Sequence, residues 1–225
     1  MQNRRDFLLL AGASAGFIFA APSKEPEVTA TEDLMREHGV IRRALIVYAE
    51  TAPKLRKDPN NVDPVALRET AQLFRTFGEN YHEKMLEERH IFPVVRKAGG
   101  SLARYVDVLT SQHSRGREIT DYIMTVTAGP KIGATRGEAL AKVLDGLVRM
   151  YESHAAREDT IVFPAWKQNF SNKQLEELAD QFEDIEHRAF GKDGFEEAEK
   201  KIGGIEARLG LADLAMFTPP PPPKP

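Results

Sequence analysis

The segment that decides the fold is Tyr151–Pro164, which reads Y-E-S-H-A-A-R-E-D-T-I-V-F-P. His154 and Glu158 are four residues apart, a spacing that places two side chains on one face of an α-helix. Apolar residues continue that face at steps of three and four: Leu140, Leu144, Leu147, Tyr151 and Ile161. This period predicts a helix that buries both the imidazole and the carboxylate. A buried ionised carboxylate needs a partner, so we expect a metal ion, an Arg or a second His beside it.

A near copy of this segment lies upstream at Tyr81–Pro93, which reads Y-H-E-K-M-L-E-E-R-H-I-F-P. When the Phe-Pro pairs are aligned, Glu87 falls opposite Glu158, but His82 is displaced by one residue. A separation of five residues is about 140° around a regular helix. Either Glu83 shares a site with His82, or a π-bulge absorbs the extra residue. We favour the bulge, because it keeps Glu87 in register with Glu158 and because π-bulges are frequent at functional sites.

The chain contains four long segments with helical periodicity. We expect helices from a Thr29–Glu32 capping box to about residue 51, over 64–93, over about 102–128 and over about 135–163. Residues 54–61 are expected to form a charged loop. Long helices with short connections predict an all-α fold, an antiparallel four-helix bundle.

Each predicted helix places one histidine in its apolar stripe, and two helices add a carboxylate. The inward residues are His38, His82, Glu87, His113, His154 and Glu158. For one helix alone, a hydrogen-bonded core His–Glu pair explains the pattern equally well. The same arrangement on two helices, with a histidine on each of the other two, favours a shared metal site.

The regions outside the bundle divide into three. Residues 1–22 contain Asn3-Arg4-Arg5-Asp6-Phe7 followed by an apolar stretch, which is similar to a twin-arginine export signal and predicts a periplasmic protein. The bundle is expected over 29–166, and additional helices over 167–217, beginning at a Ser171-x-x-Gln174 cap. Residues 218–225 form a proline-rich tail.

Composition restricts the possible functions. The chain has 225 residues and a net charge of −3, so no basic field favours nucleic acid, and we expect no stable membrane insertion once the signal is removed. It has no cysteine, which excludes thiolate metal sites and disulfides. Any metal must therefore be held by nitrogen and oxygen.

Taken in order, the motifs resemble a hemerythrin-like HHE cation-binding domain. They are E-H at His38, Y-H-E-K…E-E…I-F-P at 81–93, Q-H-x-x-G-R at 112–117 and H-x-x-x-E-D…V-F-P at 154–164. The resemblance implies a non-haem centre of two iron ions, with the two Glu as bridges and an open position for O₂, NO or a related small ligand. It implies as ligands His38, His82, Glu87, His113, His154 and Glu158.

One departure from the respiratory members of this family concerns Arg117, which stands four residues after His113 where they place a second histidine. Glu83, His90, His187 or water are open as replacements, although His90 lies near the end of its helix and His187 lies off the apolar stripe of its helix. The favoured hypothesis is a protein that binds O₂, NO or iron for sensing, scavenging or storage. The alternatives are a diiron redox enzyme (an oxidase, peroxidase or ferroxidase), a metal-free structural bundle, and a site for zinc or manganese.

Overall fold

The structure is a computed structural model that describes residues 28–223, and over this range it contains helices and no strand. The predicted signal at 1–22 lies outside the described residues. The part of the proline tail within the description, 218–223, is exposed and forms no helix. Across 28–223 the helices are too short or too polar for any of them to traverse a lipid bilayer.

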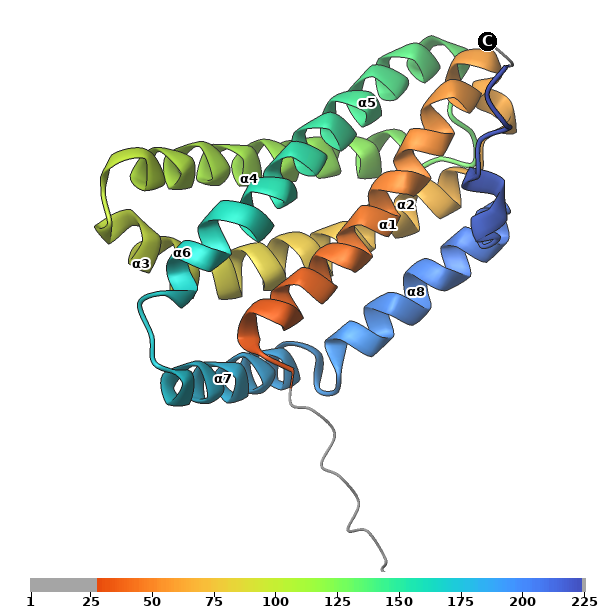
Figure 1. Cartoon of the computed structure of the whole chain (residues 1–225). Helices are drawn as coiled ribbons and strands as arrows, with labels where there is room; N and C mark the ends of the chain where they lie inside the picture. The colour runs from red at the N-terminus through yellow and green to blue at the C-terminus, as the bar shows by residue number, and fades with distance from the viewer. Residues whose placement is uncertain (1–27, 224–225) are drawn as a thin grey trace, which may run out of the picture.

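Four helical rods form the bundle, and successive rods run in opposite directions (Figure 1). The first is α1 (Ala30–Lys57), linked by the short η1 (Pro59–Asn61) to the second, which combines α2 (Pro64–Leu73), η2 (Phe74–Ile91) and α3 (Phe92–Lys97). The third is α4 (Gly100–Val126), and the fourth combines α5 (Ala134–Arg157), η3 (Glu158–Val162) and α6 (Phe163–Lys167). The predicted antiparallel four-helix bundle is confirmed.

Local capping explains where the first two rods begin. The Thr29 hydroxyl accepts a hydrogen bond from the Glu32 N–H at 3.3 Å. The Asp63 carboxylate accepts from the Val65 N–H at 2.8 Å, and Pro64 occupies the first helical position. Proline suits that position, because the N–H it lacks has no partner inside a helix.

The first helix is longer than predicted. It continues past Thr51 and through Pro53 to Lys57, so the expected loop at 54–61 is wrong for its first four residues. Leu55 is 1 % exposed, and its burial holds the last turns against the core. Burying a side chain of this size contributes about 1.5–3 kcal/mol, enough to offset one missing backbone hydrogen bond.

Both Phe-Pro motifs follow π-helical segments rather than ending a helix. The π segment η2 spans 18 residues, much longer than the single bulge predicted, and η3 is its shorter counterpart. At their ends the Phe92 N–H donates to the Glu87 carbonyl, and the Phe163 N–H donates to the Glu158 carbonyl, each five residues back. The rods then continue through α3 and α6, so the predicted ends near 93 and 163 are wrong. A wider turn before a proline gives its ring room beside the preceding carbonyls.

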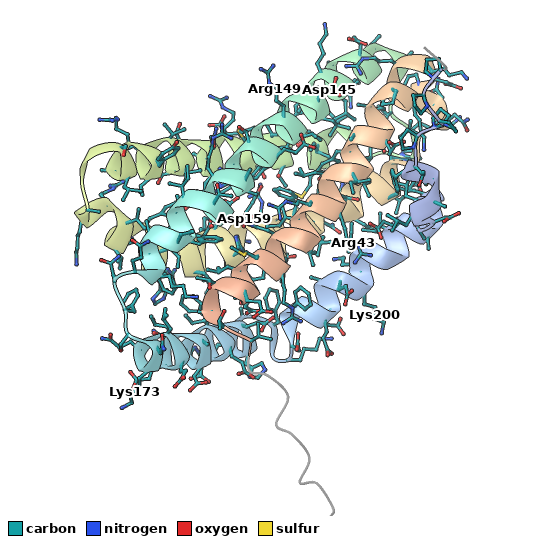
Figure 2. All side chains as sticks on the ribbon, in the orientation of Figure 1. Arg43, Asp145, Arg149, Asp159, Lys173 and Lys200 are labelled. Atoms are coloured by element: carbon teal, nitrogen blue, oxygen red, sulfur yellow. The ribbon has the colours of Figure 1, made fainter. Side chains whose placement is uncertain are left out.

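Two further helices follow the bundle, as predicted, and a short helical turn comes after them. They are α7 (Asn172–Phe190), α8 (Gly194–Leu209) and η4 (Leu214–Phe217). Ser171 and Gln174 form the predicted capping box of α7. Figure 1 shows α8 lying along α1, and Arg43, labelled in Figure 2, joins them by donating to Glu206 at 3.0 Å (Nε–Oε1) and 2.6 Å (Nη2–Oε2).

The interior is apolar at both ends and polar in the middle. The aromatic core includes Trp166, whose indole N–H donates to the His90 carbonyl at 3.1 Å and so joins the ends of the second and fourth rods. The predicted stripes of the four bundle helices are buried, except that Val162 replaces Ile161 at the end of the fourth rod, where the π segment shifts the buried face by one residue. The polar layer between these apolar regions is the candidate site.

Candidate metal centre

The six residues expected to bind metal lie together in the middle of the bundle. Each is at most 3 % exposed. His38 comes from α1, His113 from α4 and His154 from α5, while His82 and Glu87 come from η2 and Glu158 from η3. Three groups of side chains in the described chain bring donor atoms close enough to hold a metal ion, and two of them are built from these six residues.

Glu87 lies between two histidines from different helices. Its Oε1 atom is 3.3 Å from His82 Nε2, and its Oε2 atom is 3.3 Å from His113 Nε2. The five-residue separation of His82 and Glu87 fits the i→i+5 turn of the π segment, so both side chains point to the same side. Glu87 therefore belongs to both possible metal-binding groups, the one with His82 and the one with His113.

Glu158 occupies the corresponding position on the opposite rod. Its Oε2 atom is 3.0 Å from His154 Nε2 and 3.5 Å from His38 Nε2. The rings of His38 and His82 are neighbours, with centroids 4.7 Å apart, and those of His113 and His154 are 4.9 Å apart. The site thus consists of two histidine pairs with a carboxylate on each side.

The donor atoms at the centre lack hydrogen-bond partners. Both carboxylate oxygens of Glu87, both of Glu158 and the Nε2 atom of His82 are buried and unpaired within the described chain. Ligands about 2.1 Å from a shared ion and at right angles to one another would lie about 3.0 Å apart. The separations of 3.0–3.5 Å between these carboxylate oxygens and imidazole nitrogens are close to that value. The residues present therefore fit a bound cation.

The outward nitrogen of each of the four clustered histidines is held by an oxygen from a neighbouring helix. His38 Nδ1 lies 2.7 Å from Asp159 Oδ1, and His113 Nδ1 lies 3.0 Å from Glu88 Oε1. The other two contacts pair His154 Nδ1 with Gln112 Oε1 at 2.9 Å and His82 Nδ1 with Glu37 Oε2. An oxygen acceptor fixes the proton on Nδ1 and leaves the Nε2 lone pair free for a metal, as is usual for metal-binding histidines.

These four oxygen-bearing residues form a closed cycle around the bundle. Glu37 of α1 holds the η2 histidine, Glu88 of η2 holds the α4 histidine, Gln112 of α4 holds the α5 histidine, and Asp159 of η3 holds the α1 histidine. Each follows or precedes an expected ligand by one residue. None of the four was expected to contact a histidine, although the dipeptides E-H, E-E, Q-H and E-D carry the signal.

The two inward carboxylates favour positive charge beside them. Burial raises the pKa of Glu87, but the charge of His82 and the neighbouring imidazole of His113 outweigh burial and hold that pKa well below its usual range. Burial lowers the pKa of His113, but Glu83 and Glu87 reverse this and raise it to about 10. In the bare protein, protons on the imidazoles would supply the positive charge that a metal cation supplies when bound.

His113 and His154 give a second indication that the site suits a cation. Their Nε2 atoms lie 3.1 Å apart, while both Nδ1 atoms are already engaged with oxygen acceptors. Two imidazole lone pairs cannot face each other at this distance without a proton or a metal ion between them.

Glu83 and Arg117 have roles outside the central cluster. Arg117 Nη1 donates to Glu83 Oε2 at 3.0 Å, and Arg117 Nη2 donates to Glu88 Oε1 at 2.8 Å. The other oxygen of Glu83 accepts from the Tyr151 hydroxyl at 2.6 Å. Gly116 makes room for that hydroxyl, because a Cβ at position 116 would lie 2.1 Å from it. Glu83 approaches His113 only on its Nδ1 side, at 3.9 Å, as a member of the third possible metal-binding group, with Glu88.

The last two histidines are distant from the centre. His90 is half-buried at the end of η2, with its ring against Phe182. His187 is exposed on α7. Neither belongs to any of the possible metal-binding groups in the described chain.

The chain is similar to known proteins over most of its length. Residues 29–166 match the model of the hemerythrin HHE cation binding domain. The chain is also 44 % identical over 199 residues to uncharacterized proteins of Mycobacterium tuberculosis and Mycobacterium bovis, covering 88 % of this chain and 77 % of each relative. No solved structure matches. On its fold, its buried histidine and glutamate cluster and this match, the chain belongs to the hemerythrin HHE cation-binding family.

Proposed function

We propose that the protein is a non-haem diiron protein that binds O₂, NO or a related small ligand, or iron itself, for sensing, scavenging or storage. His38 and His82 would hold one iron ion, and His113 and His154 the other. Glu87 and Glu158 would bridge the two.

The observation that carries this proposal is the position of Glu87. One of its oxygens faces His82 and the other faces His113, each at 3.3 Å, and neither has a hydrogen-bond partner. A carboxylate in a structural ion pair would use both oxygens in hydrogen bonds. Burying a charged group unpaired costs several kcal/mol, which a cation on each side of Glu87 would offset.

The ligand chemistry favours iron. A set of imidazole and carboxylate ligands without thiolate suits non-haem iron, which when bound supplies open coordination positions and redox chemistry. Two anionic carboxylates offset part of the charge of two Fe²⁺ ions in a site closed to water. The proposed assignment gives each ion two imidazoles and two shared carboxylates, which leaves room for a small ligand.

The outer residues support binding rather than turnover. They fix the orientation of each imidazole, and within the described chain the two proposed ion positions are enclosed by side chains that are almost fully buried. A small diatomic molecule can enter such a site more readily than an organic substrate.

The test is iron stoichiometry combined with absorption spectra of the full chain in reduced, oxygenated and oxidised states. Two iron ions per chain and a spectrum that changes with O₂ or NO, without turnover, are the expected results. Steady consumption of peroxide would instead favour the diiron redox enzyme. Less than one iron per chain after expression in iron-replete cells, or stoichiometric zinc or manganese, would contradict the proposal.

We also propose that the protein is exported to the periplasm. The twin-arginine pattern at Arg4-Arg5 supports transport of a folded, metal-loaded protein to the periplasm. Fractionation of cells that express the chain, compared with a variant in which both residues are changed to Lys, tests it. Retention of the unaltered protein in the cytoplasm would contradict export.

A further inference from the structure

A groove on the surface between α4 and α5 lies beside the candidate metal centre. Its volume is about 360 Å³, and it is lined by Arg104, Tyr105, Val108 and Gln112 of α4 and by Arg157 of α5, among others. Small-molecule sites in proteins usually span about 300–1,000 Å³. The groove is therefore large enough for an organic molecule of one or two rings.

The charged side chains that line this groove are all positive. Arg104 and Arg157 come from opposite walls, and the described residues that line it include no Asp or Glu. Arg157 donates to the Ser153 carbonyl at 2.9 Å, and neither guanidinium forms an ion pair within residues 28–223. By contrast, Arg117, close by in the bundle, is held by two carboxylates. Two guanidinium groups without anionic partners favour a ligand that carries a carboxylate.

Gln112 adds a third donor and connects the groove to the metal centre. Its Oε1 atom accepts from His154 Nδ1 at 2.9 Å, so its amide NH₂ group points away from the histidine. Gln112 is half-buried and lines the groove, and its NH₂ group has no partner in the described part of the chain. A carboxylate bound there would accept from the amide whose oxygen orients a proposed iron ligand.

Apart from Ser101 and Ser153, the remaining lining is apolar or aromatic. Val108 is 54 % exposed although it is a large aliphatic residue, Leu109 is 2 % exposed and forms the floor, and Tyr105 adds an aromatic ring. These surfaces suit a flat or branched hydrocarbon body next to the charged group.

We propose that this groove binds a small aromatic carboxylate, and that its occupancy is transmitted through Gln112 to His154 and the metal centre. Binding itself requires only the protein, whereas its effect on the metal rests on the proposed function. Gln112 acts as a positioning residue: the ligand polarises its amide and so changes the hydrogen bond that orients the imidazole of His154.

The test uses 2-naphthoate as the probe and the neutral 2-naphthalenemethanol as its uncharged counterpart, titrated calorimetrically into the full chain with and without iron. We expect the carboxylate to bind both forms and the alcohol to bind at least about tenfold more weakly, because hydrogen bonds to charged groups contribute most. Arg104→Gln and Arg157→Gln should each weaken naphthoate binding about tenfold. The matched control is Arg149→Gln, which removes the same charge from an exposed site on α5 outside the groove (Figure 2) and should leave binding unchanged.

A second readout tests the connection to the metal. Naphthoate should shift the absorption spectrum of the iron-loaded protein, and Arg157→Gln should reduce that shift at equal naphthoate concentration while iron content stays the same. No binding at millimolar naphthoate, equal binding of the alcohol, or equal loss in all three Arg variants would overturn the groove assignment. Binding without a spectral shift would overturn the connection alone. If naphthoate binds to a chain that takes up no iron, the groove assignment holds and the proposed function is contradicted.

Discussion

The substitution Glu158→Gln tests the metal centre most directly. It keeps the size of the side chain but removes its charge and one oxygen donor. Glu158 Oε2 lies 3.0 Å from His154 Nε2 and 3.5 Å from His38 Nε2, so both proposed ions lose a ligand. The expected result is a large loss of metal-dependent stability.

The magnitude follows from mass action. A ligand present at 1,000 times its dissociation constant stabilises the folded state by about 4.1 kcal/mol. In a chain of this size that corresponds to a rise in Tm of about 8–16 °C. If the substitution weakens binding about 100-fold, the same free metal concentration is only tenfold above the dissociation constant. The stabilisation then falls to about 1.4 kcal/mol, or about 3–6 °C.

The assay is thermal unfolding followed by circular dichroism under anaerobic conditions, with and without Fe²⁺ at one buffered free concentration. Each variant is compared with its own metal-free form, so effects on the bare protein cancel. The control is His90→Ala, because His90 lies outside every possible metal-binding group and keeps its backbone contact with Trp166. An unchanged iron content and an unchanged Tm shift in Glu158→Gln would refute the assignment of this residue.

Three further predictions concern residues around the centre. Asp159→Ala removes the acceptor of His38 Nδ1 and should weaken metal binding about 10–100-fold in competition with a chelator; equal affinity would show that the contact does not orient the ring. Gly116→Ala places a Cβ 2.1 Å from the Tyr151 hydroxyl and should lower the free energy of unfolding by about 1–3 kcal/mol, measured with urea. Burial raises the pKa of Glu186 from 4.5 to about 7, so its protonated form favours folding. That contribution is complete below pH 4.5 and is lost as the pH rises through about 7, and between pH 5 and 8 the unaltered chain should lose about 1–2 kcal/mol more stability than Glu186→Gln. Parallel pH profiles would contradict this.

The sequence predicted the helices and the residues they bury with little error, because both depend on local spacing. The stripe on α4 illustrates this: Val106, Leu109, His113, Gly116 and Thr120 repeat at steps of three and four, and all are buried. The errors lie at the ends of helices. The first helix was expected to end near residue 51 and the second at Pro93, yet both continue, because tertiary packing and the π segment compensate for the N–H that proline lacks.

The candidate site was predictable only in part. The inward histidines and glutamates follow from helical phase, and the irregular spacing of His82 and Glu87 pointed to a π segment. The length of that π segment could not be predicted from the spacing, because the i→i+5 pattern is sustained by packing along the whole rod. Arg117 was recognised as unable to bind metal, but its contacts with Glu83 and Glu88 required the three-dimensional arrangement of η2 and α4.

By itself, the sequence determined that four amphipathic helices each point a histidine inward, that two also point a carboxylate inward, and that the absence of cysteine confines any metal to nitrogen and oxygen ligands. These properties follow from the 3.6-residue period and from side-chain chemistry. Only the tertiary structure decided which atoms meet. The cycle of outer contacts from Glu37, Glu88, Gln112 and Asp159, each to a histidine on another rod, depends on the rotation and height of neighbouring helices. Those quantities are set by packing between residues far apart in the chain, which local periodicity does not encode.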